Sequence, residues 1–196
     1  MTSFNDTSSV LSFLKSRKSG SAKAMGPPGP DAAQLAEILG IAVRVPDHGK
    51  LTPWRFVIFE GEARTSIGEV FAKRYRELHP SHGEEPLAFQ RGLFTRAPTV
   101  IGVVSRAAPH PKIPEWEQQM SAAAVAYNIE LAAAAMGFQS QWQTDWVAYD
   151  REVGKAIGLS ETERFAGFVY IGTSTAPLED RPRPDPQALV TRWSGA

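Results

Sequence analysis

The stretch that most constrains the fold runs from Glu115 to Met136, where a predicted helix is rich in alanine and poor in charge. Its apolar residues do not keep to one face, so the helix must be buried on most sides. Gly137 supplies the residue type that often ends a helix. We therefore expect a central helix that also contributes to a dimer seam. The run is too weakly hydrophobic for a membrane span, because it is mostly alanine and contains Asn128 and Glu130.

Periodicity predicts the elements around this helix. Strands are expected at residues 54–59, 99–105 and 165–171, and the run 99–105 is apolar enough to be covered on both faces. Apolar residues at helical spacing predict helices at residues 9–18, 31–44, 64–78 and 150–157. Few strands and much helix indicate an α+β fold. A length of 196 residues fits one domain, 8–196, behind a disordered start, 1–7.

Charge and motif content exclude several classes of function. Lys plus Arg and Asp plus Glu number 21 each, so no basic excess favours nucleic acid or membrane. There is no cysteine, which excludes disulfides and a thiolate nucleophile, and the polar start lacks a secretory signal, so we expect a cytoplasmic protein. The motifs of elbow hydrolases, P-loop NTPases and Rossmann proteins are absent. His79 and His82 lack a third ligand, so we expect surface histidines and no metal site.

Three polar stretches are candidates for ligand binding. The first group is Arg17, Lys18 and Ser19, at the end of a predicted helix. A guanidinium, an ammonium and a hydroxyl suit a phosphate. Cations also favour helix C-termini for dipole reasons, which is the plainer interpretation of the same residues.

The other two stretches lie further along the chain. The loop group, Arg44 and His48, lies where a helix stops and a strand begins, although an ordinary solvated loop has the same punctuation by Pro and Gly. The strand group is Gln141, Trp142 and Gln143, within an aromatic and amide-rich run. Such a run suits a flat heterocycle, but a strand containing Trp is as often part of the core.

Taken together, these stretches resemble the nitroreductase family, and most of all its short bacterial NAD(P)H nitroreductases. The shared anchors, in order, are the helix end at residues 16–19, the segment 44–56, the segment 116–122, Gly137-Phe138 and the segment 170–173. The resemblance extends from about Val10 to Thr173. In the broader family the loop reads Pro-Ser-x-x-Asn-x-Gln-Pro-Trp, and here Asp47, Lys50 and Thr52 replace the Ser, Asn and Gln.

The resemblance implies a nitroreductase-like fold: a central, mainly antiparallel sheet surrounded by helices, in a homodimer with a domain-exchanged C-terminal arm. It implies two FMN molecules at the subunit interface. The first group would contact the phosphate and ribityl end, the loop group would add a second set of contacts, and the strand group would come from the other subunit. A segment linked to the nicotinamide cofactor in the short relatives matches Ala133, Ala134, Ala135, Met136, Gly137 and Phe138.

The implied activity is that of an FMN-dependent NAD(P)H oxidoreductase. Hydride would pass by a ping-pong cycle from NADH or NADPH, through FMN, to a nitroaromatic, quinone or similar small acceptor. No catalytic acid or base is required, because the flavin carries the chemistry. His48 and Lys50 could stabilise negative charge, or His48 could be a cofactor contact alone.

Two departures from the short relatives leave alternatives open. Lys18 and Gln143 stand where those relatives often have Arg, which removes forked charge from the expected site. An FMN carrier or regulator without general reductase turnover is therefore an alternative. Dehydrogenation, dehalogenation or flavin breakdown, which are known on this fold, are others.

Overall fold

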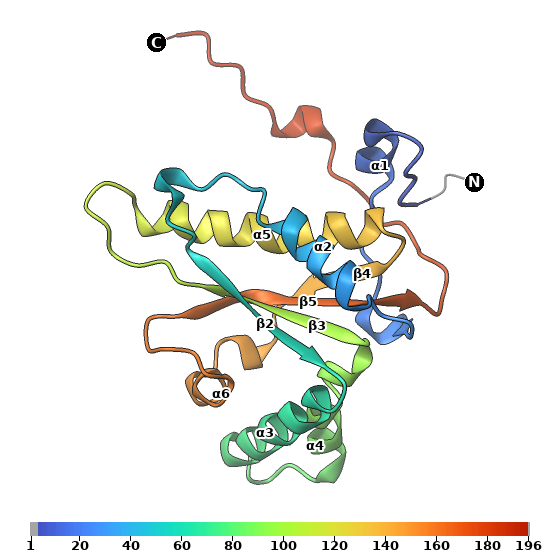
Figure 1. Cartoon of the computed structure of the whole chain (residues 1–196), viewed down its shortest axis with the longest axis vertical. Coiled ribbons are helices and arrows are strands. Elements are labelled where there is room, and N and C mark those ends of the chain that lie inside the picture. The colour runs from blue at the N-terminus through green and yellow to red at the C-terminus, as the bar shows by residue number, and fades with distance from the viewer. Residues whose placement is uncertain (1–3, 196) are drawn as a thin grey trace.

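A twisted antiparallel sheet crosses the middle of the computed structural model, which describes residues 4–195 (Figure 1). Its central strand is β5 (Arg164–Ser174), which pairs with β3 along one edge and with β4 along the other. Beyond β3 lies β2, and the short β1 pairs with the end of β5. The remaining strands are β1 (Met25–Gly26), β2 (Trp54–Glu60), β3 (Thr99–Ser105) and β4 (Gln139–Gln143).

Helices cover both faces of the sheet (Figure 1). One face carries α2 (Ala32–Ala42) and the long α5 (Glu115–Ala135), and the other carries α3 (Ala63–Leu78), α4 (Glu84–Arg91) and α6 (Arg151–Ile157). The first helix, α1 (Val10–Ser16), lies apart from both layers, near the C-terminal segment (Figure 1). Short 3₁₀ turns occupy Ala22–Ala24, His48–Lys50, Phe94–Arg96, Trp146–Ala148 and Pro186–Leu189.

The strand alternation divides the core into two layers. In β3, Val100 and Val104 pack with the aromatic cluster on the α3 side, whereas Ile101 and Val103 pack with the alanines of α5. Every residue of β3 is buried, which confirms the prediction of a strand covered on both faces. The central helix is confirmed too: α5 is buried along most of its length and ends before Gly137, whose φ is 86°.

The structure differs from the sequence predictions at several places. The first helix ends at Ser16, so Arg17 and Lys18 follow the helix. The second helix ends at Ala42, so Arg44 follows the helix instead of lying in its last turn. The polar stretch after His79 contains the helix α4, which the sequence analysis did not predict. Leu87 anchors this helix in the core, but the polar residues around it hide this signal when hydropathy is averaged along the sequence. The C-terminal segment forms a 3₁₀ turn at Pro186–Leu189, which the sequence analysis did not predict.

The two chain ends differ in their surroundings. The predicted disordered start, 1–7, lies in part outside the described residues. Of the remainder, Phe4, Asn5 and Thr7 lie in turns, and Asn5 exchanges two hydrogen bonds with the Lys18 backbone. The C-terminal segment extends away from the other elements (Figure 1). Its Leu189 and Trp193 are 72% and 86% exposed. Within residues 4–195, none of the helices combines the length and the apolar character that crossing a membrane requires.

A glycine in β5 determines how β4 packs. The register of β3 and β5 shifts between Val103 and Val104, opposite Gly167. Gly167 has a φ of 147°, which side-chain-bearing residues rarely adopt, and a Cβ there would lie 2.2 Å from the indole nitrogen of Trp142. The same indole N–H donates to the Ala166 carbonyl at 3.2 Å. The bulge therefore makes room for Trp142 and fixes its ring.

Candidate functional site

The first group forms a compact cluster of donors after α1. Arg17 Nη1 donates to Ser19 Oγ at 3.0 Å, and the Arg17 guanidinium lies 5.4 Å from the centre of the Tyr127 ring on α5. The Lys18 backbone is held by Asn5 from both sides. The guanidinium and the hydroxyl are thereby presented together, as an anion site requires.

A buried carboxylate on α5 joins this cluster to β4. Glu130 Oε1 accepts from Ser19 Oγ at 2.9 Å and from the Trp142 backbone N–H at 3.1 Å. Glu130 Oε2 lies 3.9 Å from Arg17 Nη1. One side chain thus connects the first group with the strand group.

The chain after the first group covers the free edge of β4. The Gly20 N–H donates to the Ser140 carbonyl at 2.9 Å, and the Ala22 N–H donates to Gln141 Oε1 at 2.6 Å. The resemblance implied that Gln141, Trp142 and Gln143 would come from the other subunit. Within one chain, the strand group lies beside the first group, and its contribution to a cofactor bound by the other subunit stays a prediction.

The strand group does not present its side chains in one direction. Gln141 and Gln143 point to the α3 side, whereas Trp142 packs toward α5. Gln143 hydrogen bonds with Tyr170, and burial raises the pKa of the Tyr170 hydroxyl to about 12, an effect that the Gln143 bond opposes. The Gln143 amide is therefore engaged inside the chain.

The loop group lies elsewhere, against the other half of α5. Asn128 donates to the Ile41 carbonyl at 2.7 Å, Ser121 donates to the Pro46 carbonyl, and His48 Nδ1 lies 2.7 Å from Glu117 Oε2. These contacts anchor the part of the connection that follows α2, as far as His48. Arg44 and His48 themselves are exposed.

The backbone of this loop is strained. Lys50 and Thr52 have φ angles of 56° and 49°, which residues with a side chain adopt at a cost of about 1 kcal/mol or more. The Asp47 carboxylate offsets part of that cost by accepting from the N–H groups of Leu51 and Thr52. Strain maintained in this way is typical of segments that bind or position a ligand.

The geometry of α5 separates the loop group from the other two. Glu117, Ser121 and Asn128 fall on one face of the helix, because successive residues turn by about 100°. Glu130 lies about 180° around the helix from Ser121. The α5 residues that contact the segment of the loop group and the α5 carboxylate that contacts Arg17 therefore lie on different sides of the helix.

The segment predicted to contact a nicotinamide cofactor, residues 133–138, includes the C-terminal end of α5 and the turn that follows it. Ala133, Ala134 and Phe138 are buried, while Ala135 and Gly137 are exposed and Met136 is intermediate. Part of this segment lines a cavity of about 230 Å³ beside Asn5. Next to it, Gln139 Oε1 is buried without a hydrogen-bond donor from residues 4–195. That oxygen is an acceptor that a ligand hydroxyl would satisfy.

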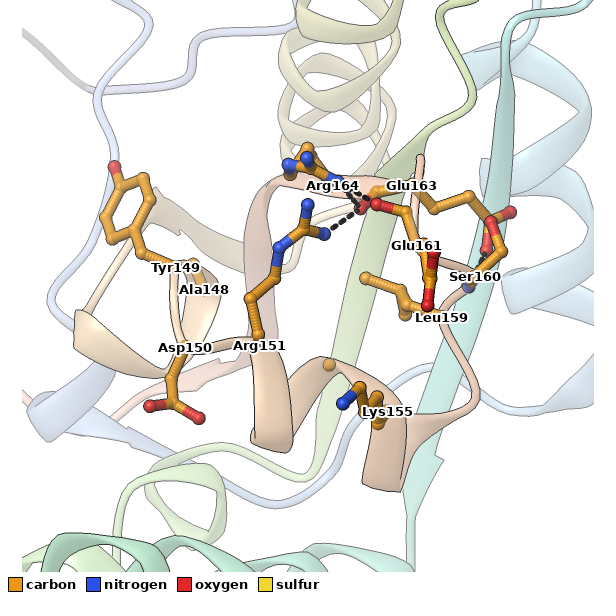
Figure 2. A pocket seen from close by; sticks show the side chains of 11 residues that line it. Ala148, Tyr149, Asp150, Arg151, Lys155, Leu159, Ser160, Glu161, Glu163 and Arg164 are labelled. Atoms are coloured by element: carbon orange, nitrogen blue, oxygen red, sulfur yellow. Dashed lines mark hydrogen bonds between the residues drawn. The ribbon is translucent and has the colours of Figure 1, made fainter.

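A cavity of about 340 Å³ lies beside α6, away from the predicted groups (Figure 2). Arg151 and Arg164 face it, but both guanidiniums donate to the Glu163 carbonyl, and Lys155 pairs with Glu152. None of the predicted site residues lines it. Because none of the three candidate groups contributes to this cavity, we place the candidate site at Arg17 and β4 instead.

Glu163, at the edge of this cavity, ties the ends of three strands together. Its carboxylate accepts from Arg55 Nε at 2.7 Å and Nη2 at 2.8 Å, and from the Ser160 N–H at 2.9 Å. The hydrogen bonds from Arg55 lower the pKa of Glu163 to about 2, against the effect of burial. Arg106 adds a second positive charge at 3.7 Å.

We expect this carboxylate to give the protein a characteristic loss of stability in acid. Because its folded pKa lies below the usual value of 4.5, its stabilising effect is complete above that value and is lost as the pH falls toward 2. Glu163→Gln should lower the free energy of unfolding at pH 7 by about 2 kcal/mol and flatten the decline below pH 4.5. Urea titrations at pH 7 and pH 3 measure both quantities. Glu161→Gln, at an exposed neighbour, is the control, and equal declines for all three proteins would contradict the assignment.

Glu130 is the residue that the sequence predictions missed. It occurs in the most alanine-rich part of the chain, where an ionisable side chain has to find buried partners. That signal was available from the sequence. The identity of the partners was not, because they come from segments more than a hundred positions earlier and about ten positions later.

Comparisons with known proteins agree with this fold. The model of the nitroreductase family matches residues 14–173. A protein of Haemophilus influenzae, provisionally named an NAD(P)H nitroreductase, is 37% identical over 171 residues, which are 87% of this chain and 91% of that protein.

Solved structures of low sequence identity share the same fold. A nitroreductase-like family protein from Bacillus cereus superposes with a TM-score of 0.80 at 21% identity, over 98% of this chain and all of that one. A nitroreductase with bound FMN from Bacteroides fragilis gives a TM-score of 0.67 at 22% identity, over 93% of this chain and 98% of that one. With the family model matched over most of its length and a relative above 30% identity, the chain belongs to the nitroreductase family.

Proposed function

We propose that this chain is an FMN-dependent NAD(P)H oxidoreductase that reduces a nitroaromatic, quinone or similar small acceptor in ping-pong turnover. Membership of the nitroreductase family supports the reaction class, and the name of the Haemophilus influenzae relative supports NAD(P)H as donor. The observation that carries the proposal is the cluster of Arg17 and Ser19 beside the edge of β4.

The residues at this cluster fit the phosphate and ribityl end of FMN. Arg17 offers a planar fork of donors, Ser19 a hydroxyl and Lys18 a point charge, which together match phosphate oxygens. The buried acceptor Gln139 Oε1 lies beside Gly20 and suits a ribityl hydroxyl. Bound FMN would supply the two-electron redox chemistry, and the chain would bind and orient it.

We infer that a second copy of the chain completes the site. An exposed apolar stripe on α5 contains Trp116, Met120 and Tyr127, which are 67%, 47% and 41% exposed. Going around the helix, the stripe has Glu130 on one side and the face that holds the loop group on the other. A two-fold contact across the stripe would therefore bring Arg44 and His48 of the partner toward Arg17. The exposed Leu189 and Trp193 suit an arm that wraps the partner.

In such a dimer the loop group would contribute positive charge and hydrogen-bond donors to the shared site. His48 is oriented by Glu117, and Lys50 is exposed at the tip of the strained turn. Both could stabilise negative charge that develops on the reduced cofactor or the acceptor.

Reduction of the flavin by nicotinamide tests the reaction class directly. We expect NADH or NADPH to bleach the visible absorbance of the FMN-reconstituted protein in a stopped-flow instrument, and a nitroaromatic or quinone to restore it afterwards under anaerobic conditions. The two half-reactions should occur separately, as ping-pong turnover requires. A protein that binds FMN but whose absorbance neither donor bleaches would overturn the reductase assignment.

Gln143 favours a second candidate function, that of an FMN carrier or regulator. Its amide is engaged by Tyr170, so the strand group offers no forked cation to the cofactor. Measuring the FMN dissociation constant together with NAD(P)H oxidation, with and without a nitro acceptor, separates the two functions. Tight FMN binding without oxidation is the result expected of a carrier.

A further inference from the structure

Among the carboxylates of α5, only Glu130 is buried, with 6% of its side chain exposed. A buried carboxylate is destabilising unless hydrogen bonds and an opposite charge compensate it. Glu130 obtains this compensation from Ser19, from the Trp142 N–H and from Arg17. No other carboxylate within residues 4–195 pairs with Arg17.

These partners are the donors that the proposed function assigns to the cofactor phosphate. Ser19 has a single hydroxyl hydrogen, and it is donated to Glu130. Arg17 faces the same carboxylate at 3.9 Å. A phosphate that binds there has to share both donors with a negative charge already in place.

We propose that Glu130 sets the affinity of this site for a flavin nucleotide, by competing with the phosphate for Ser19 and Arg17. The inference rests on the proposed FMN site. With no ligand bound, the carboxylate neutralises Arg17 and keeps the first group joined to β4. With a phosphate bound, the same buried charge repels it, because screening by water is weak inside the protein. Glu130 is thus a positioning residue that makes the cofactor more readily exchangeable.

The variant Glu130→Gln tests the effect of the negative charge separately from that of the hydrogen bonds to Ser19 and the Trp142 N–H. The amide oxygen of glutamine still accepts from Ser19 and from the Trp142 N–H, but the negative charge is gone. We expect FMN to bind about tenfold more tightly to this variant, and riboflavin, which has no phosphate, to bind with unchanged affinity. Fluorescence titration of each flavin gives the dissociation constants. Glu130→Asp keeps the charge and should not tighten FMN binding.

A second uncharged variant keeps the outcome decisive. Glu130→Met removes the charge with an apolar side chain of similar length, and it provides the same comparison should Glu130→Gln fail to fold. FMN affinity that stays equal or falls in the uncharged variants would overturn the inference, and so would an equal gain for FMN and riboflavin.

Inorganic phosphate distinguishes this inference from the proposed function. If the wild-type protein binds neither flavin, the proposed function fails, and the melting temperature in phosphate against chloride of equal ionic strength then tests Glu130. A larger stabilisation by phosphate in Glu130→Gln than in the wild type and Glu130→Asp supports the competition. Equal stabilisation in the three proteins refutes it.

Discussion

Replacing Gly167 with alanine is expected to lower the free energy of unfolding by about 3 kcal/mol or more and to displace β4. The new Cβ would meet the Trp142 indole nitrogen at 2.2 Å and the Gln143 carbonyl oxygen at 3.1 Å. Alanine at this position would also have to adopt the φ of 147° that Gly167 has. The indole cannot move away without losing its bond to the Ala166 carbonyl, so the strand itself has to shift.

A matched control separates backbone strain from steric overlap. Gly158, at the end of α6, has a φ of 90°, and a Cβ there would meet nothing within 4 Å. Gly158→Ala should therefore lower the free energy of unfolding by only about 1 kcal/mol. In the double variant Gly167→Ala/Trp142→Ala the overlap is gone, and the two effects should be less than additive. Urea denaturation provides all these values, and equal losses at Gly158 and Gly167 would show that Trp142 does not confine the bulge.

Mixing two defective variants is expected to restore FMN binding, because the proposed site takes Arg17 from one chain and Arg44 from the other. Arg17→Ala and Arg44→Ala should each weaken FMN binding tenfold or more, roughly the effect of losing a charge-assisted hydrogen bond. When they are unfolded together and refolded, about half of the dimers contain one chain of each kind. Each of these mixed dimers has one intact site, so about a quarter of all sites should bind FMN with wild-type affinity.

A chain that carries both substitutions should instead reduce the number of intact sites when it is mixed with the wild type. When Arg17→Ala/Arg44→Ala is refolded with an equal amount of wild-type protein, every mixed dimer has two defective sites. Occupied sites should then fall from about half to about a quarter of the total. Equilibrium titration with FMN after refolding measures the fraction of intact sites in both experiments. If the single-variant mixture recovers nothing, Arg17 and Arg44 do not act on one cofactor across an interface.

The sequence predicted the layers of this fold better than the assembly of its site. The nearly continuous apolar run at 99–105 and the alanine content of 115–136 are local signals, and the structure confirms a doubly covered strand and a central helix there. α4 escaped prediction because one buried leucine, Leu87, stands among charged residues, and a window average gives such an anchor little weight.

The arrangement of the three groups depends on contacts that no local pattern encodes. Whether the segment after Arg17 covers β4 of its own chain or of a partner is decided by hydrogen bonds such as Gly20 to Ser140. In the sequence, Glu130 is an isolated charged residue within an apolar run. Only the structure shows that Ser19 and the Trp142 N–H donate hydrogen bonds to it. Family resemblance indicated candidate residues, and the three-dimensional structure showed which of them contact one another.

The position of β5 at the centre of the sheet has a consequence for biosynthesis. β5 pairs with β1, β3 and β4. Because Met25 in β1 pairs with Ser174, β1 has no partner strand until the end of β5 has been synthesised. During translation the β2–β3 pair can form first, but its inner edge stays unpaired until residues 164–174 have left the ribosome. At typical elongation rates of about 5–20 residues per second, the stretch from the end of β3 to the end of β5 takes several seconds to synthesise. Over that interval the unpaired N–H and C=O groups of β3 in the nascent chain are open to pairing with another strand, so slow synthesis of residues 106–174 prolongs the risk of aggregation.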